Sequence, residues 1–403
     1  MEIRTFILRS LQIRKIVEIN SDSIDEVLRT AVKDRIPAVS AAVIAHDKNI
    51  YEGHFGYSDL SKNSLVDEKS LFRIASMTKA ITSACIFQLI DKNLLNLNTQ
   101  LKEYFPEIAD RKVIEGFDEN GEAILKDVTN DITIGHLITH TSGFAYEIWN
   151  ANIAKLVEKG DLVSAFSTSD EFLKAPLIFE PGTSWEYGIG IDWLGVLIEK
   201  IGECSLQDYM KKNIFEPLEM DDTSYDFSEE EHHRVVNVYG RNGSDYQEMP
   251  FSIPKQSAFY SGGGNLISSL DNYSKFLKVF LNSGKSNGAE ILSSSSTESM
   301  LSSLNREVLM TKMPSVAPML SNDVEFFPQS SKSWSPGFMI NHDDIESGRP
   351  KLSAGWAGLF NSYFWIDKET GIAGIFATQL FPFFDEKVIK HYNAFESEVY
   401  KAL

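Results

Sequence analysis

Two segments near opposite ends of the chain have the residue pattern of β-hairpins. In the first, the apolar run 39–45 and the run 50–55 flank a turn of Asp, Lys and Asn at 47–49. In the second, residues 362–366 and 372–378 flank a turn that ends in Gly371. Apolar runs joined by such turn residues predict antiparallel strand pairs. Because the hairpins lie far apart in the chain, they predict one sheet that both ends of the chain share.

The residues between the hairpins have helical spacing instead. Helices are predicted over 79–95, 132–139, 192–201 and 273–281, and a last one over 385–403. This order predicts an α/β fold in the α+β sense, with an antiparallel sheet flanked by helices and a mostly helical lobe. We expect one domain over 21–403, in which the helical lobe is an insertion at roughly 80–175, and an N-terminal extension over 1–20. A cleft between the two lobes is the expected site.

The charge of the chain restricts its partners. The 403 residues include 38 Lys and Arg against 57 Asp and Glu, a formal net charge of −19. Nucleic-acid binding needs clustered cations that displace counterions, so no nucleic-acid partner is expected. Charged residues from Glu2 to Lys15 interrupt the first segment, so neither an export signal nor a membrane span is expected there.

The cysteines indicate the compartment. Cys85 and Cys204 are far apart and form no C-x-x-C pair. Neither a disulfide framework nor a zinc site is suggested, and a reducing, cytoplasmic location is expected.

The tetrad Ser76-Met77-Thr78-Lys79 is the sharpest chemical signal in the sequence. If a helix begins here, residues three apart share a face, and the Lys79 amine can reach the Ser76 hydroxyl. Unpaired N–H groups at a helix start would favour an alkoxide or an oxyanion. Serine needs a base, and a lysine can serve if burial or a nearby cation lowers its pKa. The structural alternative is a serine that caps the helix beside a solvated lysine.

The same spacing occurs a second time, at Ser252-Ile253-Pro254-Lys255. Pro254 disfavours helical angles at Ile253, so Ser252 and Lys255 are not expected to share a helical face. This second tetrad is expected to be a loop.

Two further segments favour chemistry at the first tetrad. The turn-rich stretch 179–190 delivers Tyr187 just before a helix, and a phenol beside an ammonium could exchange the Ser76 proton with Lys79. The segment 355–359 precedes the C-terminal hairpin, and its small residues would let an edge strand approach a substrate. The Leu359 N–H is the candidate oxyanion donor. The structural alternatives are a packed aromatic and an ordinary strand with a buried tryptophan.

Ser-x-x-Lys, a tyrosine about a hundred residues later and Trp-x-Gly near the end together resemble the β-lactamase-related esterases, often called family VIII carboxylesterases. The resemblance extends over nearly the whole chain, and segments 132–143, 180–182 and 364–367 belong to it. Fungal acyltransferases that load a short acyl chain onto a polyketide alcohol share this architecture, and class C β-lactamases and D,D-peptidases are more distant. The resemblance implies a β-lactamase/D,D-peptidase-like fold with Ser76 as nucleophile and Lys79 and Tyr187 as bases. It also implies the N–H groups of Ser76 and Leu359 as oxyanion donors.

The sequence departs from the penicillin-recognising members at two contacts. Their second motif ends in Asn, whereas Tyr187 is followed here by Gly188 and Ile189. Their third motif supplies a lysine for the substrate carboxylate, and the matching residue here is the neutral Trp356. Weak or absent β-lactamase activity is therefore predicted.

Other chemistries lack their motifs. The sequence holds neither a G-x-S-x-G elbow nor an H-E-x-x-H zinc site, and Gly262-Gly263-Gly264 lacks the lysine of a phosphate loop. The triglycine is expected to let backbone pass close to the cleft. His140 could be a general base, but a structural hydrogen bond is the favoured role. Neither a metal nor a cofactor is expected.

The sequence thus predicts a serine carboxylesterase (EC 3.1.1 type) that hydrolyses short-chain acyl esters through an acyl-enzyme on Ser76. The partner expected is a small-molecule ester. The alternatives are an acyltransferase with an alcohol acceptor, a weak β-lactamase or D,D-peptidase, and a non-catalytic binding module. Residues near the motifs are candidates for the substrate pocket, although such aromatics are commonly core. These residues are Tyr146, Trp149, Trp185, Trp356, Ala357 and Gly358.

Overall fold

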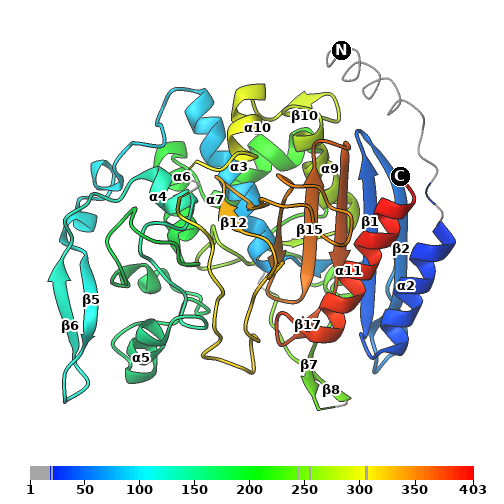
Figure 1. Ribbon diagram of the computed structural model, residues 1–403, viewed down its shortest axis with the longest axis horizontal. Coiled ribbons are helices and arrows are strands. Elements are labelled where there is room, and N and C mark those ends of the chain that lie inside the picture. The colour runs from blue at the N-terminus through cyan, green and yellow to red at the C-terminus, as the bar shows by residue number, and fades with distance from the viewer. Residues whose placement is uncertain (1–18, 20, 244, 254–255, 305–306) are drawn as a thin grey trace.

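One antiparallel sheet organises the computed structural model, which describes residues 19, 21–243, 245–253, 256–304 and 307–403 (Figure 1). The order of its eight strands is β12-β13-β14-β15-β16-β1-β2-β3. The strands are β1 Ala38–Ala45, β2 Lys48–Asp59, β3 Ser64–Leu65, β12 Lys332–Trp334, β13 Met339–Asn341, β14 Ala354–Gly358, β15 Ser362–Asp367 and β16 Ile372–Ala377. The extension predicted over 1–20 lies, apart from Ile19, outside the described residues.

The two predicted hairpins meet at the centre of this sheet. In β1, seven of eight residues are buried, as expected for an apolar strand that is covered on both faces. It pairs with β2 on one side and with β16 on the other, so that Ser40 lies opposite both His54 and Ala377. The prediction that both ends of the chain share one sheet is therefore confirmed.

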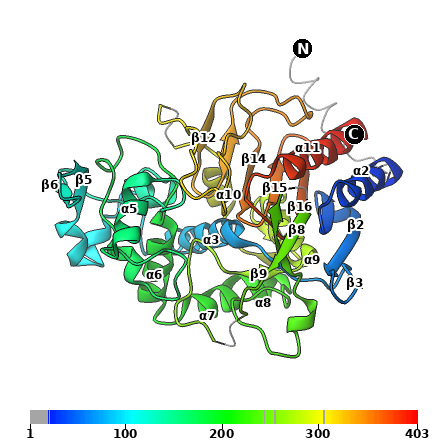
Figure 2. The same cartoon turned by 90° about the horizontal axis from the view of Figure 1, so that it is seen from below.

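Helices cover both faces of the sheet. Ile24, Leu28 and Ala31, spaced three and four residues apart, form the buried face of α2 (Ser21–Lys33). This helix packs beside α11 (Glu386–Lys401), and α9 (Leu270–Leu281) covers the opposite face (Figures 1 and 2). The remaining helices on this side of the molecule are α8 Glu216–Leu218 and α10 Ser294–Met300.

The helical lobe lies on the other side of α3 (Thr78–Asp91), as Figure 2 shows. Twelve consecutive residues of α3, from Thr78 to Leu89, are buried, because the helix lies between the sheet and the lobe. The lobe contains α4 Ile134–Ile138, α5 Ala151–Lys159, α6 Gly190–Gly202 and α7 Leu206–Met210. The hairpin of β5 (Lys112–Phe117) and β6 (Ala123–Asp127) projects from it (Figure 1).

Short strands complete the architecture. A three-stranded sheet has the order β17-β7-β8, and two small ribbons pair β4 with β9 and β10 with β11. Their bounds are β4 Phe72–Arg73, β7 Val238–Asn242, β8 Asp245–Met249, β9 Ile267–Ser268, β10 Lys285–Ser286, β11 Ala289–Glu290 and β17 Leu380–Phe381. Among the described residues, none of the helices is long and apolar enough to cross a membrane.

Candidate active site

The candidate nucleophile Ser76 lies in a tight turn at the start of α3. A short 3-10 helix, Ala75–Met77, precedes α3. The φ of Ala75 is +44°, a left-handed conformation that is unfavourable for a residue with a Cβ atom. The strained turn leaves Ser76 partly exposed, while Met77 and Thr78 are buried.

Lys79 is buried directly behind Ser76, at 1% exposure. Its Nζ lies 3.2 Å from Ser76 Oγ, 3.0 Å from the Tyr146 hydroxyl and 2.7 Å from the Gly263 carbonyl oxygen. Burial lowers the pKa of Lys79 to about 7, against the opposing effect of the Asp192 charge. Near neutral pH a large share of this amine is therefore unprotonated and can accept a proton. This geometry is what the sequence predicted for the Ser-x-x-Lys spacing.

Tyr187 lies on the other side of Ser76, and the hydroxyls of the two residues form a hydrogen bond. The indole Nε1 of Trp356 donates a hydrogen bond to the same phenol oxygen at 2.9 Å. Burial raises the pKa of Tyr187 above its usual value, in spite of these two hydrogen bonds. The phenol is therefore protonated at neutral pH, and of the two predicted bases Lys79 is the one that is free to accept a proton.

Tyr146 was predicted to line the substrate pocket, and the structure places its hydroxyl on Lys79 instead. The same hydroxyl donates a hydrogen bond to Asp192 Oδ2 at 3.0 Å. Sequence reasoning missed Asp192, a carboxylate in the first turn of α6 that is 1% exposed. A signal was available, because Asp192 is the only charged residue in the apolar stretch from Gly190 to Ile198.

The triglycine forms the back wall of the Lys79 site, as the sequence predicted for a close backbone approach. Gly262 and Gly263 accept hydrogen bonds from Thr82 at 2.6 Å and from Lys79 at 2.7 Å. A Cβ atom on Gly263 would lie 2.6 Å from both Asp192 Oδ2 and the Tyr146 hydroxyl. Only glycine fits between these two groups without displacing one of them.

Strand β14 forms the opposite wall. A Cβ atom on Gly358 would lie 2.3 Å from the Ile74 carbonyl oxygen, so the end of β14 packs against the turn that carries Ser76. The segment was expected to be an edge strand, yet β13 pairs with its first residues, Ala354 and Gly355. Ala357 is buried and Leu359 is partly buried. The N–H groups of Ser76 and Leu359 stay a prediction as oxyanion donors.

A cage of aromatic rings surrounds the Tyr187 phenol. Its ring centroid lies 4.9 Å from that of Trp356, 5.5 Å from that of Trp149 and 4.7 Å from that of His140. Trp185 lies one ring further out, 6.4 Å from His140. Burial and the nearby Lys79 charge hold the pKa of His140 well below its usual value, so this imidazole is neutral. The Gly188 N–H donates a long hydrogen bond of 3.4 Å to His140 Nδ1.

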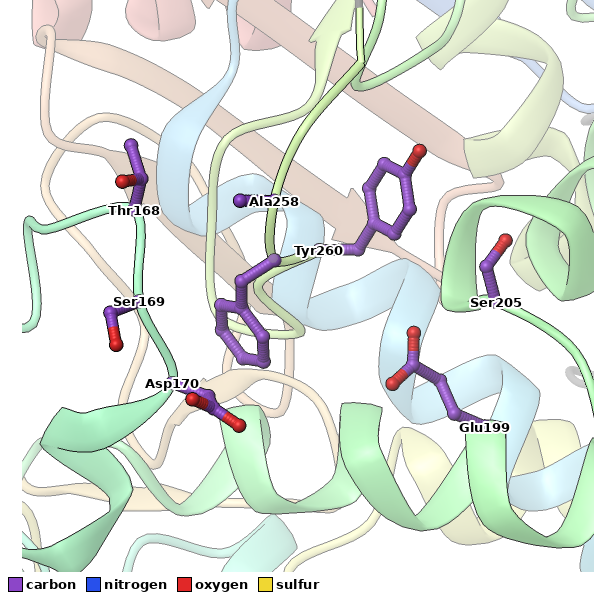
Figure 3. A pocket seen from close by; sticks show the side chains of 8 residues that line it. Thr168, Ser169, Asp170, Glu199, Ser205, Ala258 and Tyr260 are labelled. Carbon is purple, nitrogen blue, oxygen red and sulfur yellow. The ribbon is translucent and has the colours of Figure 1, made fainter.

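A pocket of about 610 Å³, to which none of these rings contributes, is shown in Figure 3. Asp170 and Glu199 face each other across it, and burial together with the Asp170 charge raises the pKa of Glu199. Tyr260 lines the pocket and directly precedes Ser261, whose hydroxyl donates to Asp192 Oδ1 at 2.5 Å. The lining residues are Thr168, Ser169, Asp170, Glu199, Ser205, Ala258, Phe259 and Tyr260.

Two other predictions concern residues outside this cluster. Pro254 and Lys255 of the second Ser-x-x-Lys tetrad lie outside the described residues, so its conformation stays a prediction.

Within the described ranges, no group of three or more His, Cys, Asp or Glu side chains could hold a metal ion. Cys85 is buried and Cys204 is exposed, and both are free thiols.

The fold and the Ser76 cluster together define the class of protein. The family model described as Beta-lactamase matches residues 24–397, and the chain therefore belongs to the Beta-lactamase family. The chain is 28% identical over 367 residues to the acyltransferase calJ of Penicillium decumbens. This match covers 87% of this chain and 85% of that protein. It is 27% identical over 360 residues to a lovastatin esterase of Penicillium rubens, covering 81% of this chain and 86% of that protein.

The fold has close counterparts among solved structures. Unliganded simvastatin synthase (LovD) from Aspergillus terreus superposes with a TM-score of 0.80 at 24% identity, over 94% of this chain and 97% of that one. The resemblance to β-lactamase-related esterases and fungal acyltransferases is confirmed, as is the predicted fold class. The chain is an enzyme of the class that catalyses acyl transfer or hydrolysis.

Proposed function

We propose that this protein is a serine carboxylesterase that takes a short acyl group from an ester onto Ser76 and releases it to water. The observation that carries the proposal is the position of a buried amine, with a pKa lowered to about 7, at 3.2 Å from the Ser76 hydroxyl. Lys79 is buried, forms no ion pair within 4 Å among the described residues, and lies beside a serine that is partly exposed. This position matches the requirements of an activated nucleophile.

In the proposed mechanism Lys79 Nζ takes the Ser76 proton as Oγ bonds to the ester carbonyl carbon. The carbonyl π electrons move onto its oxygen, which the N–H groups of Ser76 and Leu359 would hold. When the tetrahedral intermediate collapses, the bond to the alcohol breaks and the leaving oxygen takes a proton from the Tyr187 hydroxyl. Lys79 then returns its proton to Tyr187. Water then attacks the acyl carbon by the same steps in reverse order. The bond from this carbon to Ser76 Oγ breaks, and the free acid and Ser76 are released.

Acyl transfer to an alcohol is the second candidate, and two observations favour it. The relatives include calJ, named an acyltransferase, as well as a lovastatin esterase. The rings of Trp149 and Trp356 against Tyr187 make an apolar surrounding that would favour an organic acceptor over water. Both functions share the acyl-enzyme, and the acceptor distinguishes them.

The test measures acylation and acceptor choice separately. Stopped-flow release of p-nitrophenol from acetate, butyrate and octanoate esters should give a burst that Ser76→Ala lacks. The products are then analysed with and without added alcohols of increasing size. Free acid as the main product, with no increase in turnover on adding alcohol, supports the esterase. Faster turnover with the new ester as the main product supports the acyltransferase, and a folded wild type that releases no p-nitrophenol from any of the esters contradicts both.

A further inference from the structure

Asp192 lies behind the catalytic pair without contacting Ser76, and its three hydrogen bonds all come from groups around Lys79. Oδ2 accepts from the Tyr146 hydroxyl at 3.0 Å. Oδ1 accepts from the Ser261 hydroxyl at 2.5 Å and from the Gly263 N–H at 2.9 Å. At 1% exposure, the carboxylate depends on these protein donors for its solvation.

Two of these groups also contact Lys79 directly. The Tyr146 oxygen lies 3.0 Å from Lys79 Nζ, and the Gly263 carbonyl oxygen lies 2.7 Å from it. Asp192 therefore accepts from the same Tyr146 hydroxyl that contacts the amine, and from the N–H of the same glycine whose carbonyl oxygen contacts the amine. The Gly263 Cβ position, 2.6 Å from both Asp192 and Tyr146, shows how closely the groups are packed.

These contacts fix the direction of each hydrogen bond. A carboxylate only accepts, so the single hydroxyl proton of Tyr146 points to Asp192 and its oxygen must accept from Lys79. The Gly263 carbonyl can only accept as well. A neutral amine has two N–H groups and one lone pair; the two N–H groups are taken by Tyr146 and Gly263. The lone pair is left for the third neighbour, the Ser76 hydroxyl at 3.2 Å.

We propose that Asp192 is a positioning residue: by holding the Tyr146 proton it makes Lys79 present its lone pair to Ser76. The inference rests on the proposed function, because it explains how Lys79 serves as the base for acylation. The other groups that face Lys79 are the rings of Tyr146 and Tyr187, whose centroids lie 5.0 and 4.8 Å from Nζ, and the neutral His140. Asp192 is the one anion in this set.

The substitution Asp192→Asn reverses the direction of the hydrogen bond between residue 192 and the Tyr146 hydroxyl. Its amide oxygen must face the Ser261 and Gly263 donors, so its NH₂ group faces Tyr146 and donates to the phenol oxygen. The Tyr146 proton then turns to Lys79 and occupies the lone pair that Ser76 needs. We expect the acylation burst to slow about 100-fold, the scale of general-base catalysis.

Removing the Tyr146 hydroxyl should relieve this block. Tyr146→Phe alone removes the acceptor of one Lys79 N–H and the donor to Asp192 Oδ2, and we expect acylation to slow about 10-fold. The double variant Asp192→Asn/Tyr146→Phe should resemble Tyr146→Phe, and so acylate about 10-fold faster than Asp192→Asn alone. If the double variant slows by the product of the two single effects, or if Asp192→Asn acylates at the wild-type rate, the proposal is wrong.

A matched control exists elsewhere in the fold. Asp367 is also 1% exposed, accepts from the Tyr400 hydroxyl at 3.0 Å and from the N–H groups of Glu369 and Thr370. Asp367→Asn, Tyr400→Phe and their double variant should leave the burst rate within about 2-fold of wild type, since this pair lies at the far end of β15. Slowing in these variants equal to that at Asp192 would show a general stability effect and would contradict the proposal.

A second measurement needs only the conservative variant Tyr146→Phe. Loss of the acceptor that stabilises the charged amine lowers the apparent pKa of Lys79, so the acid limb of the acylation profile should move to lower pH. An unmoved limb would contradict the proposal. Labelling of wild type and Ser76→Ala with a fluorophosphonate probe tests the proposed function separately. An unlabelled wild type refutes that function itself. Labelling that depends on Ser76, together with wild-type acylation rates in the Asp192 and Tyr146 variants, refutes only the role of Asp192.

Discussion

The indole of Trp356 donates its N–H to the hydroxyl of Tyr187 at 2.9 Å. The two rings lie 4.9 Å apart between centroids, and both side chains are buried. In penicillin-recognising relatives the resemblance places a lysine where Trp356 lies. In this chain the position instead holds a hydrogen-bond donor that orients the Tyr187 phenol.

Trp356→Phe should slow acylation about 10-fold, because the Tyr187 oxygen loses its fixed donor and the phenol proton is no longer directed toward Ser76. Burst kinetics with p-nitrophenyl acetate measure this. Trp334→Phe is the matched control: its ring lies 4.5 Å from Trp356, and its Nε1 has no hydrogen-bond partner among the described residues. Equal losses in both variants would assign the effect to packing instead.

Cephalosporin turnover should be far slower than ester cleavage in the wild-type enzyme. Trp356 is 4% exposed and neutral, so a β-lactam carboxylate finds no cation at this position. Hydrolysis of a chromogenic cephalosporin, compared with p-nitrophenyl butyrate on one enzyme sample, gives the ratio. Comparable values of kcat/KM would contradict the prediction.

The rate of acylation should rise with pH and reach half its maximum near pH 7. The reactive form of Lys79 is the neutral amine, and burial lowers its pKa to about 7. Below this pH the ammonium has no lone pair for the Ser76 proton, and above it the rate reaches a plateau. The measurement is the burst rate between about pH 5 and 9. A rate independent of pH over this range would exclude Lys79 as the titrating base.

His140→Asn should leave that acid limb in place and destabilise the fold. Burial and Lys79 keep this imidazole neutral over the assay range, so removing it does not change the titration. Asn tolerates the φ of +57° at this position but loses the ring contacts with Tyr187 and Trp334. We expect a loss of about 1–3 kcal/mol in the free energy of unfolding, measured in urea. A shifted limb would make His140 the base.

Gly263→Ala should reduce acylation by at least about 100-fold, because the new methyl group would displace Asp192 or Tyr146, each 2.6 Å from its position. Gly264→Ala is the control: its Cβ atom would approach Ser261 Oγ at 3.8 Å, an ordinary contact. Similar burst rates for the two variants would show that the close packing behind Lys79 has no part in acylation.

The sequence predicted the fold well because its signals are local. The apolar run that became β1 and the small residues of β14 each carry their information within a few positions. The Ser76 and Lys79 pair is local in the same way, since one helical turn joins them. Periodicity and spacing were therefore enough to place these elements and to bring Ser76 and Lys79 together.

The network behind Lys79 could not be predicted in this way. Tyr146 lies 67 positions from Lys79 in the chain, and the Gly263 carbonyl lies 184 positions away. Their contacts arise only when the loop that carries Tyr146 and the triglycine pack on α3, and no spacing rule links them. Tyr146 consequently looked like a pocket aromatic, and Asp192 looked like an ordinary residue in the first turn of a helix.

The pairing of β1 with β16 also orders events during synthesis. As the chain leaves the ribosome, the apolar strand Ala38–Ala45 emerges early, with β2 as a partner for one edge. Its other edge stays unpaired until Ile372–Ala377 have been made. Ser76 and Lys79 emerge long before Asp192, Gly263 and β14. In the nascent chain Lys79 therefore still lacks the groups that surround it in the folded protein. In the proposed mechanism, the buried surroundings that lower the pKa of Lys79 therefore form only when the sheet closes.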